Sequence, residues 1–524
     1  MLHSFIAGLA MYLCAKCGFK FSSKTSIFLA LLYLVTPKLA GYMQAGHVGL
    51  VNSLAWIPLA IYAALKLRQT PKIKYSILLA VSLALVYFSH LPTFLIVSLG
   101  VGLLSITKRS VFHLTLAVIL VFGLTSVSLL PQMEWQKVST RYLLLQDKDV
   151  YPKWKSITEP LMMMFVPWAN GVDNLQKIDS EKWIALGILP TLLAAIGFSK
   201  LKRKFKLLTL LTAGVIFLII LNNASPIYSI LLNQNWYLLL RVSTRFWILI
   251  IPIVLYLIGL VLEKNKSKLI FLVAFLAIVE SILLGWIYLQ KPTFQDDNLA
   301  PKEVYEYLAK DKSLFKVFCL TRCLSQKEAA IYNLRLLDGY STVQQKNFNQ
   351  EAWQLTGAYW NYYTLSIPPL GTFSEKIKPD PKSLGEYNVK YIISPYKLVN
   401  LNFLFKTTIG KFYIYENKLY HQRTDAPITI YTPNLIRVDT VNFKGNQIIL
   451  SEVYSPGWKA FLNGEEEVAV QETPNALMAV DIKTTINFIE FRYHPLSFDI
   501  GKYLTLATIL FIIGYAIYQK TRKN

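Results

Sequence analysis

Two arginines four residues apart, Arg241 and Arg245, have the spacing and the chemistry to hold a phosphate group. Residues four apart share one face of a helix, and planar guanidinium groups donate paired hydrogen bonds to phosphate oxygens. Two histidines, His47 and His90, could contact a phosphate or a second substrate through their ring nitrogens. At a membrane surface the same residues have simpler roles, because arginines extend towards lipid headgroups and histidines make interfacial hydrogen bonds.

Four acidic residues are candidates for acid–base or metal chemistry. Glu134 follows a long apolar stretch and is the candidate for a catalytic carboxylate, with a solvated helix-end carboxylate as the alternative. Asp147 and Asp149 form an Asp-x-Asp pair that suits a divalent cation bound together with phosphates, although one such pair in a polar loop is a weak signal. Glu280 lies inside an apolar stretch, where it either stabilises a contact between helices or belongs to a proton pathway.

The composition indicates which elements must position these residues. The chain has 524 residues, of which 54% are hydrophobic and 16% are charged, and its mean hydropathy is +0.38. Soluble domains usually carry about 25% charged residues. These values exclude a disordered chain, a coiled coil, a small disulfide scaffold and an ordinary cytosolic enzyme.

Membrane-spanning helices account for most of the apolar residues. A helix needs about 20 mostly apolar residues to cross a bilayer, because lipid offers no hydrogen-bond partners to an open backbone. The second stretch is interrupted by Pro37 and Lys38, and the first is short. We predict about eleven such stretches, at 2–18, 26–44, 50–67, 74–90, 91–107, 112–131, 183–199, 206–222, 245–262, 268–289 and 500–518.

Basic loops predict how these spans are oriented. Lys and Arg follow every second predicted span, whereas the intervening short loops 45–49 and 222–240 contain neither. Basic loops face the cytoplasm, so in a plasma membrane the N-terminus of this chain and segment 290–499 are expected outside and the C-terminus inside. The net charge of +23 then reflects topology and contact with anionic membrane lipids, and nucleic acid is not an expected partner.

Two segments are long enough to fold outside the membrane. Residues 132–182 include an apolar piece, 161–168, which is too short to span and either lies at the membrane surface or belongs to a folded loop over the helices. The long C-terminal segment has helix and strand patterns in its first half and β-rich runs in its second half. The predicted domains are a transmembrane helical domain, a mixed α/β region, a β-sandwich, and a final span with a basic tail: 1–289, 290–425, 426–499 and 500–524.

The end of this C-terminal segment carries the motifs of a known family. Ser455-Pro456-Gly457-Trp458 is followed by Asn463-Gly464, then by Tyr493-His494-Pro495 and a span that opens at Gly501. This order resembles the C-terminal end of the YfhO-like bacterial membrane proteins. It also resembles the related membrane proteins labelled pyruvoyl-tetrahydropterin-synthase-related, a label that implies no pterin chemistry.

The resemblance implies a fold and an activity. YfhO-like proteins are similar to GT-C glycosyltransferases, which are multi-span enzymes, so it implies a GT-C-like helical domain that transfers a sugar from a polyprenyl-phosphate donor to a cell-envelope polymer or lipid on the outer face. The catalytic acid of that superfamily lies between the first two spans, which implies a position upstream of Met1 in this case. A non-catalytic binding or assembly factor for envelope polymers and a lipid or solute transporter are the alternatives.

If the protein transfers a sugar, each candidate residue can be assigned a chemical role. A carboxylate must activate the acceptor, and Glu134 is the acidic candidate that this chain retains. Cations and hydrogen-bond donors must stabilise the departing phosphate, which suits the arginine pair and both histidines. The sequence requires no cofactor, and a divalent cation at the Asp-x-Asp pair is the one candidate.

The four cysteines are predicted on opposite sides of the membrane. Cys14 and Cys17 lie at the cytoplasmic end of the first predicted span, whereas Cys319 and Cys323 lie outside. One four-cysteine zinc site is therefore excluded. The outer pair either forms a disulfide in an oxidising exterior or stays free.

Overall fold

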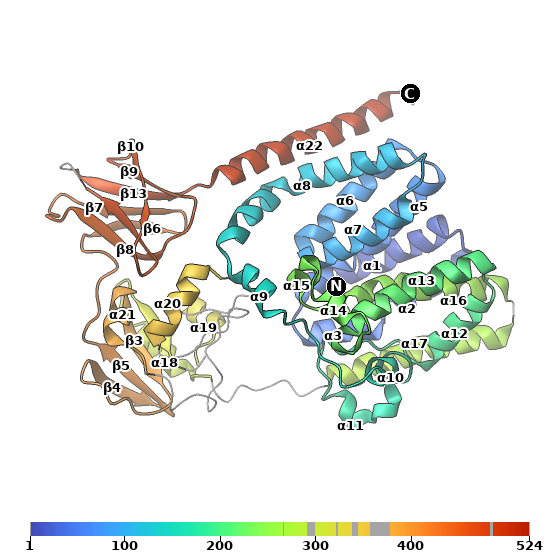
Figure 1. Cartoon of the computed structure of the whole chain (residues 1–524), viewed down its shortest axis with the longest axis horizontal. Helices are drawn as coiled ribbons and strands as arrows, with labels where there is room; N and C mark the ends of the chain where they lie inside the picture. Colours follow the sequence, from blue (N-terminus) through green and yellow to red (C-terminus); the bar gives the residue numbers. More distant parts are fainter. Residues whose placement is uncertain are drawn as a thin grey trace. The chain divides into compact units, whose positions relative to one another are not determined.

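The structure is a computed structural model, and it describes residues 2–265, 267–290, 299–320, 323–337, 344–356, 378–482 and 486–522 (Figure 1). Contacts between residues divide the chain into two compact units. The first comprises Met1–Leu129, Asp147–Thr293 and Ile500–Asn524, and the second comprises Leu130–Gln146 and Phe294–Asp499.

Helices and short connecting turns make up the first unit (Figure 1). Two of them, α8 and α22, continue into the second unit. In chain order the helices are α1 (Leu2–Leu13), η1 (Cys14–Gly18), α2 (Ser23–Leu34), α3 (Pro37–Gln44), α4 (Val48–Ser53), α5 (Ile57–Gln69), α6 (Ile73–Ser89), α7 (Leu91–Ser105), α8 (Val111–Val138), α10 (Thr158–Phe165), η3 (Pro167–Asn170), α11 (Val172–Leu175), α12 (Ile188–Ser199), α13 (Arg203–Ile220), η4 (Asn222–Ala224), α14 (Tyr228–Leu231), α15 (Asn235–Leu240), η5 (Ser243–Leu249), α16 (Ile250–Lys264), α17 (Lys268–Leu289) and α22 (Leu496–Thr521).

Several of these helices are membrane-spanning by length and composition. In the part of the chain that the structure describes, six helical segments are long and apolar enough to cross a membrane, namely Ser23–Gln44, Val48–Gln69, Val111–Val138, Ser243–Lys264, Lys268–Leu289 and Leu496–Thr521. Shorter apolar helices lie at Leu2–Gly18, Ile73–Ser89, Leu91–Ser105 and Ile188–Ser199. The chain is therefore a multi-pass membrane protein. Every predicted stretch contains a helix, but a count of eleven crossings is not confirmed.

Two predicted spans differ in detail from the observed helices. The interruption at Pro37 is present, because α2 ends at Leu34 and Pro37 opens α3. The seventh span begins later than residue 183, since α12 starts only at Ile188. Gly187, which precedes it, has a φ of +100°, a backbone conformation that a helix cannot contain. The residues before Gly187 therefore form a loop, and this loop carries the candidate site described below.

Small residues let the helices of the first unit approach closely. A Cβ atom added to Gly197 of α12 would lie 2.0 Å from the carbonyl oxygen of Leu257 in α16. The final helix packs in a similar way, because Thr505 of α22 donates a hydrogen bond to the Gly123 carbonyl of α8 at 2.9 Å. Close contact between small residues and hydrogen bonds between helices replace the hydrophobic effect in a lipid environment.

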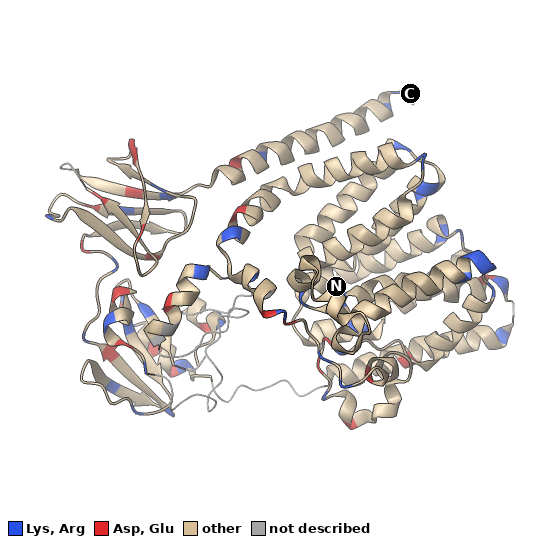
Figure 2. Ribbon diagram, in the orientation of Figure 1, with Lys and Arg blue, Asp and Glu red and all other residues tan. Residues whose placement is uncertain are grey.

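Lysine and arginine residues gather at one end of the helical unit (Figure 2). The described ones lie at the ends of α5, α12 and α16 or directly after them, as the sequence pattern predicts. Loops of this composition face the cytoplasm in multi-pass proteins. The sidedness of the termini stays a prediction.

The second unit begins with a mixed sheet covered by helices on both faces. Its strands are β1 (Lys316–Cys319), β2 (Arg335–Leu336), β3 (Val389–Ser394), β4 (Phe403–Ile409) and β5 (Phe412–Asn417), in the order β2-β1-β3-β5-β4. β1 pairs in parallel with β2 and β3, whereas β5 is antiparallel to β3 and β4. Helices α18 (Lys302–Leu308) and α19 (Gln326–Ile331) share one apolar core with the sheet. Helices α20 (Lys346–Thr356) and α21 (Pro381–Glu386) share the other.

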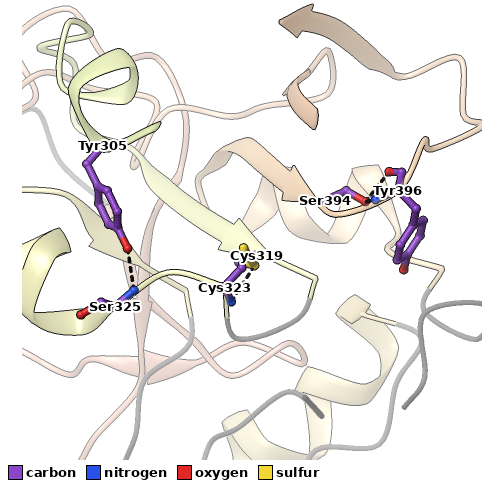
Figure 3. The surroundings of a disulfide bond; sticks show 6 residues. All are labelled: Tyr305, Cys319, Cys323, Ser325, Ser394 and Tyr396. Carbon is purple, nitrogen blue, oxygen red and sulfur yellow. Dashed lines mark hydrogen bonds between the residues drawn. A yellow bond between two sulfur atoms is a disulfide. The ribbon is translucent and has the colours of Figure 1, made fainter. Parts of the chain in front are cut away.

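Cys319 and Cys323 form a disulfide at the end of β1 (Figure 3). Both cysteines are buried, and the hydroxyl of Tyr305 accepts a hydrogen bond from the backbone nitrogen of Ser325 beside them at 2.7 Å. The sequence left a disulfide and a free pair open for these two residues. Cys14 and Cys17 are free.

Two facing sheets complete the second unit. One sheet has the order β10-β9-β13-β7-β6, and the other has the order β11-β12-β8. Inward-facing residues of both sheets share one apolar core, which is the packing of a β-sandwich. Asn463 and Gly464 join β9 to β10 with φ angles of +48° and +83°, as their turn signal predicts. The strands are β6 (Ile428–Thr432), β7 (Leu435–Asp439), β8 (Gln447–Val453), β9 (Trp458–Leu462), β10 (Glu466–Val468), β11 (Gln471–Glu472), β12 (Leu477–Asp481) and β13 (Phe488–Tyr493).

A buried charge cluster ties the mixed sheet to the sandwich. Lys316 of β1 donates a hydrogen bond to the Ser451 carbonyl at 2.7 Å and lies 3.9 Å from the Glu452 carboxylate. Arg423 also pairs with Glu452, which accepts a hydrogen bond from the Tyr431 hydroxyl at 2.7 Å. Burial lowers the pKa of Lys316 to about 8, although the negative charge of Glu452 opposes this by stabilising the ammonium form. The two parts are therefore joined by interactions that tolerate little rearrangement.

The predicted sidedness can be tested with single cysteines in a Cys14→Ser, Cys17→Ser background. Val399 is fully exposed in the second unit, and Ser267 is exposed in the loop between α16 and α17. We expect Val399→Cys in whole protoplasts to react with a membrane-impermeant maleimide and Ser267→Cys to react only after lysis. Labelling in the reverse order would contradict the orientation.

Candidate functional site

A loop that precedes α12 carries a buried carboxylate, Glu181. The indole nitrogen of Trp183 donates a hydrogen bond to the Pro37 carbonyl at 2.7 Å, and its ring stacks on Tyr288 with centroids 4.4 Å apart. Gly41 of α3 allows this approach, because a Cβ atom there would lie 2.8 Å from the Trp183 ring. The loop is therefore anchored to α3 and α17, and Glu181 has a defined position.

Three basic side chains from separate elements meet the Glu181 carboxylate. Arg245 of η5 donates to Oε1 from Nη2 at 3.1 Å. The Nε2 atom of His47, in the turn before α4, lies 3.3 Å from the same oxygen. Lys38 of α3 places its ammonium 3.9 Å from Oε2 and donates to the Ser180 carbonyl at 2.9 Å. We name Lys38, His47, Glu181 and Arg245 the Glu181 cluster.

Glu181 is ionised despite its burial. Its side chain is 8% exposed. Burial alone would raise the pKa of Glu181, but the hydrogen bond from His47 and the charges of Arg245 and Lys38 outweigh that effect and hold the pKa well below its usual value. One carboxylate thus faces a guanidinium, an amino group and an imidazole, so basic groups outnumber acidic ones in the cluster.

The backbone at Arg241 differs from the helix that its spacing from Arg245 indicated. The spacing of Arg241 and Arg245 predicted one helical face, but α15 ends at Leu240 and η5 starts at Ser243. Arg241 itself has a φ of +61°, an uncommon conformation for a residue with a side chain. A hydrogen bond from the Tyr151 nitrogen to the Arg241 carbonyl, at 2.7 Å, holds it there. The prediction of one helical turn between the arginines is therefore wrong.

His90 caps a helix at the edge of the cluster. Its Nδ1 atom accepts a hydrogen bond from the Thr93 nitrogen at 3.3 Å and lies 2.8 Å from the Thr93 hydroxyl, at the start of α7. A ring nitrogen that accepts this bond carries no proton, so only Nε2 of His90 can donate to a ligand. His90 therefore caps α7, and its predicted contact with a phosphate or second substrate stays untested.

Polar atoms of the cluster have unused hydrogen-bonding capacity. Within the described ranges, Oε2 of Glu181, Nε of Arg245 and Oγ1 of Thr244 are buried without a hydrogen-bond partner. Buried polar atoms usually have partners, because leaving one unsatisfied costs about 1–3 kcal/mol. Two donors among mostly basic groups suit an anionic ligand.

An apolar groove shares a wall with the cluster. Its cavity volume, the space that the centre of a water-sized sphere can occupy, is about 30 Å³. Lys38 and Tyr42 line it on the polar side, and the Lys38 ammonium lies 4.4 Å from the Tyr42 ring centroid. The apolar lining residues are Ala7, Leu34, Leu39, Val51, Leu54 and Ile251. The groove is therefore mainly apolar, and Lys38 lines it together with the polar side chains of His3, Ser4 and Thr36.

Glu134 does not belong to the cluster. It lies near the end of α8 in the second unit, where its carboxylate accepts a hydrogen bond from the Ser497 hydroxyl. Glu134, Trp135, Pro456 and Tyr493 line a small pocket of that unit. The structure thus joins Glu134 to the Pro-Gly-Trp segment, and a catalytic role for it is untested.

The Asp-x-Asp pair has no third metal ligand among the described side chains. Asp149 forms an ion pair with Lys153 at 3.3 Å, and both side chains are 46% exposed. Among the residues that the structure describes, no three His, Cys, Asp or Glu side chains are arranged to hold a metal ion. A divalent cation at Asp147 and Asp149 stays an untested prediction.

Glu280 caps a helix from inside the membrane domain. Its carboxylate, on α17, accepts hydrogen bonds from the Ile188 and Leu189 nitrogens at the start of α12 and from the Trp168 indole, each at 2.8 Å. The first nitrogens of a helix have no partners within the helix, and a carboxylate there also meets the positive end of the helix dipole. This geometry favours the structural interpretation over a proton pathway.

Sequence reasoning missed the central residue of the cluster. Glu181 lies in the mixed-charge stretch Asp179-Ser180-Glu181-Lys182, which precedes the seventh predicted span and was interpreted as loop surface. Lys38 was identified as part of the interruption of the second predicted span, yet it is 1% exposed and lies beside Glu181. The pattern that could have identified the cluster was the position of Asp179 and Glu181 just before the seventh predicted span. This position has the same predicted membrane depth as Lys38, Arg241 and Arg245.

Comparison with known proteins adds a limited finding. No family model matches the chain, and no curated protein matches it. Among solved structures it is similar to arabinofuranosyltransferase AftD from mycobacteria, with a TM-score of 0.47 and 10% identity over 92% of this chain and 33% of that one. A mutant of the same enzyme aligns with a TM-score of 0.43 and 9% identity over 94% and 53%. The chain spans a third to about half of these structures, and the resemblance to YfhO-like proteins stays a prediction.

Replacing Glu280 tests its role as a helix cap. Glu280→Ala removes the acceptor for three donors, each of which costs about 1–3 kcal/mol when left unsatisfied. We expect the melting temperature of the detergent-purified protein to fall by several degrees, and Glu280→Gln to cause a smaller loss. Leu276→Ala, on an exposed face of the same helix, is the control and should have little effect. An unchanged melting temperature for Glu280→Ala would exclude the capping role.

Proposed function

We propose that the Glu181 cluster and the adjoining groove bind a polyprenyl-phosphate-linked sugar, and that the protein transfers this sugar to a cell-envelope polymer or lipid on the outer face of the membrane. The observation that carries the proposal is Lys38, which belongs to the cluster and to the apolar groove at once. A phosphate joined to an isoprenoid chain has the same combination of charge and apolar tail.

The charges of the cluster suit a lipid phosphate. Arg245 has one buried donor, Nε, without a partner among the described residues, and it is already oriented by Glu181. A guanidinium group held in this way loses little conformational freedom when it binds phosphate oxygens. In the transfer step the same cations would stabilise the negative charge that develops on the departing polyprenyl phosphate.

Other readings of the same fold have less support. Glu280, on which the transporter alternative depended, has the contacts of a helix cap. A non-catalytic binding or assembly factor would bind the same lipid but release no sugar, so an experiment that follows binding and transfer separately distinguishes it from an enzyme.

Binding of the lipid phosphate is the first test. Native mass spectrometry of the detergent-purified protein should detect undecaprenyl phosphate bound in preference to undecaprenol, which lacks the phosphate. We expect Arg245→Ala to weaken binding of undecaprenyl phosphate by at least tenfold, and Arg245→Lys to weaken it less, because lysine keeps the charge and loses the paired donors.

Transfer is measured on the same variants. Membranes provide the acceptor, and a panel of undecaprenyl-phosphate-linked hexoses and pentoses provides the donor. The control is Lys153→Ala, which removes an exposed cation of the same unit that pairs with Asp149. Equal binding of undecaprenol and undecaprenyl phosphate would contradict the proposal, and binding without release of sugar would favour the non-catalytic alternative.

A further inference from the structure

We infer that His47, held by Glu181, accepts the proton of the acceptor hydroxyl in the proposed transfer. This inference rests on the proposed function and names a catalytic residue within it. Sequence reasoning placed His47 among the phosphate contacts, whereas its geometry pairs it with a buried carboxylate.

His47 and Glu181 differ in their access to the outside. The His47 side chain is 37% exposed, whereas that of Glu181 is 8% exposed, and 3.3 Å separates His47 Nε2 from Glu181 Oε1. A hydrogen on Nε2 satisfies the carboxylate and leaves the lone pair of Nδ1 available, a tautomer assigned from the partner. A carboxylate behind an imidazole fixes its orientation and stabilises its protonated form.

Glu181 itself is poorly suited to act as the base. Its carboxylate is buried, and its pKa is held far below the usual value by His47, Arg245 and Lys38, although burial opposes this. General bases work best when their pKa lies near the operating pH. The exposed imidazole is the member of the cluster that can both reach an acceptor and take up a proton.

The backbone around His47 keeps the ring in place. The His47 nitrogen donates to the Tyr42 carbonyl at 2.9 Å, and the His47 carbonyl accepts from Val51 in α4 at 3.0 Å. Gly46, with a φ of +71°, makes the turn that precedes it. Position 47 is therefore tied to both helices that flank the turn.

Several charged and titratable groups face the ring from the neighbouring elements. Lys38 and Tyr42 lie on α3, and the Tyr42 and His47 ring centroids are 6.5 Å apart. Arg245 lies on η5, and His90, whose ring is engaged in a cap, lies between α6 and α7. Glu181 is the one negatively charged group among these neighbours, and it lies 3.3 Å from Nε2 of His47.

The proposed step balances in atoms and electrons. The acceptor O–H bond breaks and its proton passes to Nδ1 of His47, while the oxygen forms a bond to the anomeric carbon of the sugar. The bond between that carbon and the phosphate oxygen breaks, and its electron pair stays on the polyprenyl phosphate, next to Arg245 and Lys38. The exposed side of His47 then returns the proton to water.

Transfer assays separate catalysis from binding. We expect His47→Gln to lower kcat by about 10²–10⁴-fold, a much larger effect than its effect on the binding of undecaprenyl phosphate, for which Arg245 and Lys38 provide the charge. Glu181→Gln should also lower kcat, because the imidazole loses the carboxylate that orients it, and Glu181→Asp should restore part of the wild-type rate.

Chemical modification tests the pair without a transfer assay. Diethyl pyrocarbonate reacts with unprotonated imidazole nitrogens, and peptide mass spectrometry locates the product among the six histidines of the chain. We expect His47 in the full-length protein to react at least tenfold faster than His90, whose Nδ1 is engaged in a cap.

These results distinguish the inference from the function on which it rests. The role of His47 would be overturned, and the proposed function left intact, by either of two results. One is a transfer rate in His47→Gln equal to that of the wild type, and the other is modification of His47 and His90 at equal rates. A wild-type protein that binds no undecaprenyl phosphate would overturn both.

Discussion

The site depends on one costly arrangement, the ionised Glu181 carboxylate buried within the helical unit. A carboxylate removed from water is stable only when cations and hydrogen bonds compensate for the lost hydration. Arg245, His47 and Lys38 provide this compensation from three separate elements. The carboxylate therefore connects the ends of several helices, and it also orients the groups that would meet a ligand.

The same physical rule appears at two other places with a different outcome. Glu280 accepts hydrogen bonds from three N–H donors and caps α12, so its hydrogen-bonding capacity is used within the fold. Glu452 joins Lys316 and Arg423 where the mixed sheet meets the sandwich. The Glu181 cluster differs from these in two ways, because it has an exposed imidazole and borders an apolar groove.

The individual residues show how far local patterns lead. His47 and Arg245 were selected from residue type and predicted depth, and they do meet in the structure. Arg241 was selected because of its spacing from Arg245, but a left-handed backbone conformation separates the two helices there. Glu134 was selected from its place after a span, and it packs in the other unit beside the Pro-Gly-Trp segment. The spacing of two residues in the sequence predicts that they share a face only when both lie in one regular helix.

The sequence by itself determined the class of the protein, the positions of the apolar helices and the β-rich character of the C-terminal part, because these follow from hydrophobic length and short-range periodicity. The tertiary structure decided which polar residues meet. Lys38, His47, Glu181 and Arg245 are separated by up to about two hundred positions in the chain. Their contacts depend on helix packing and on the loop anchored by Trp183, and no local pattern records either of these.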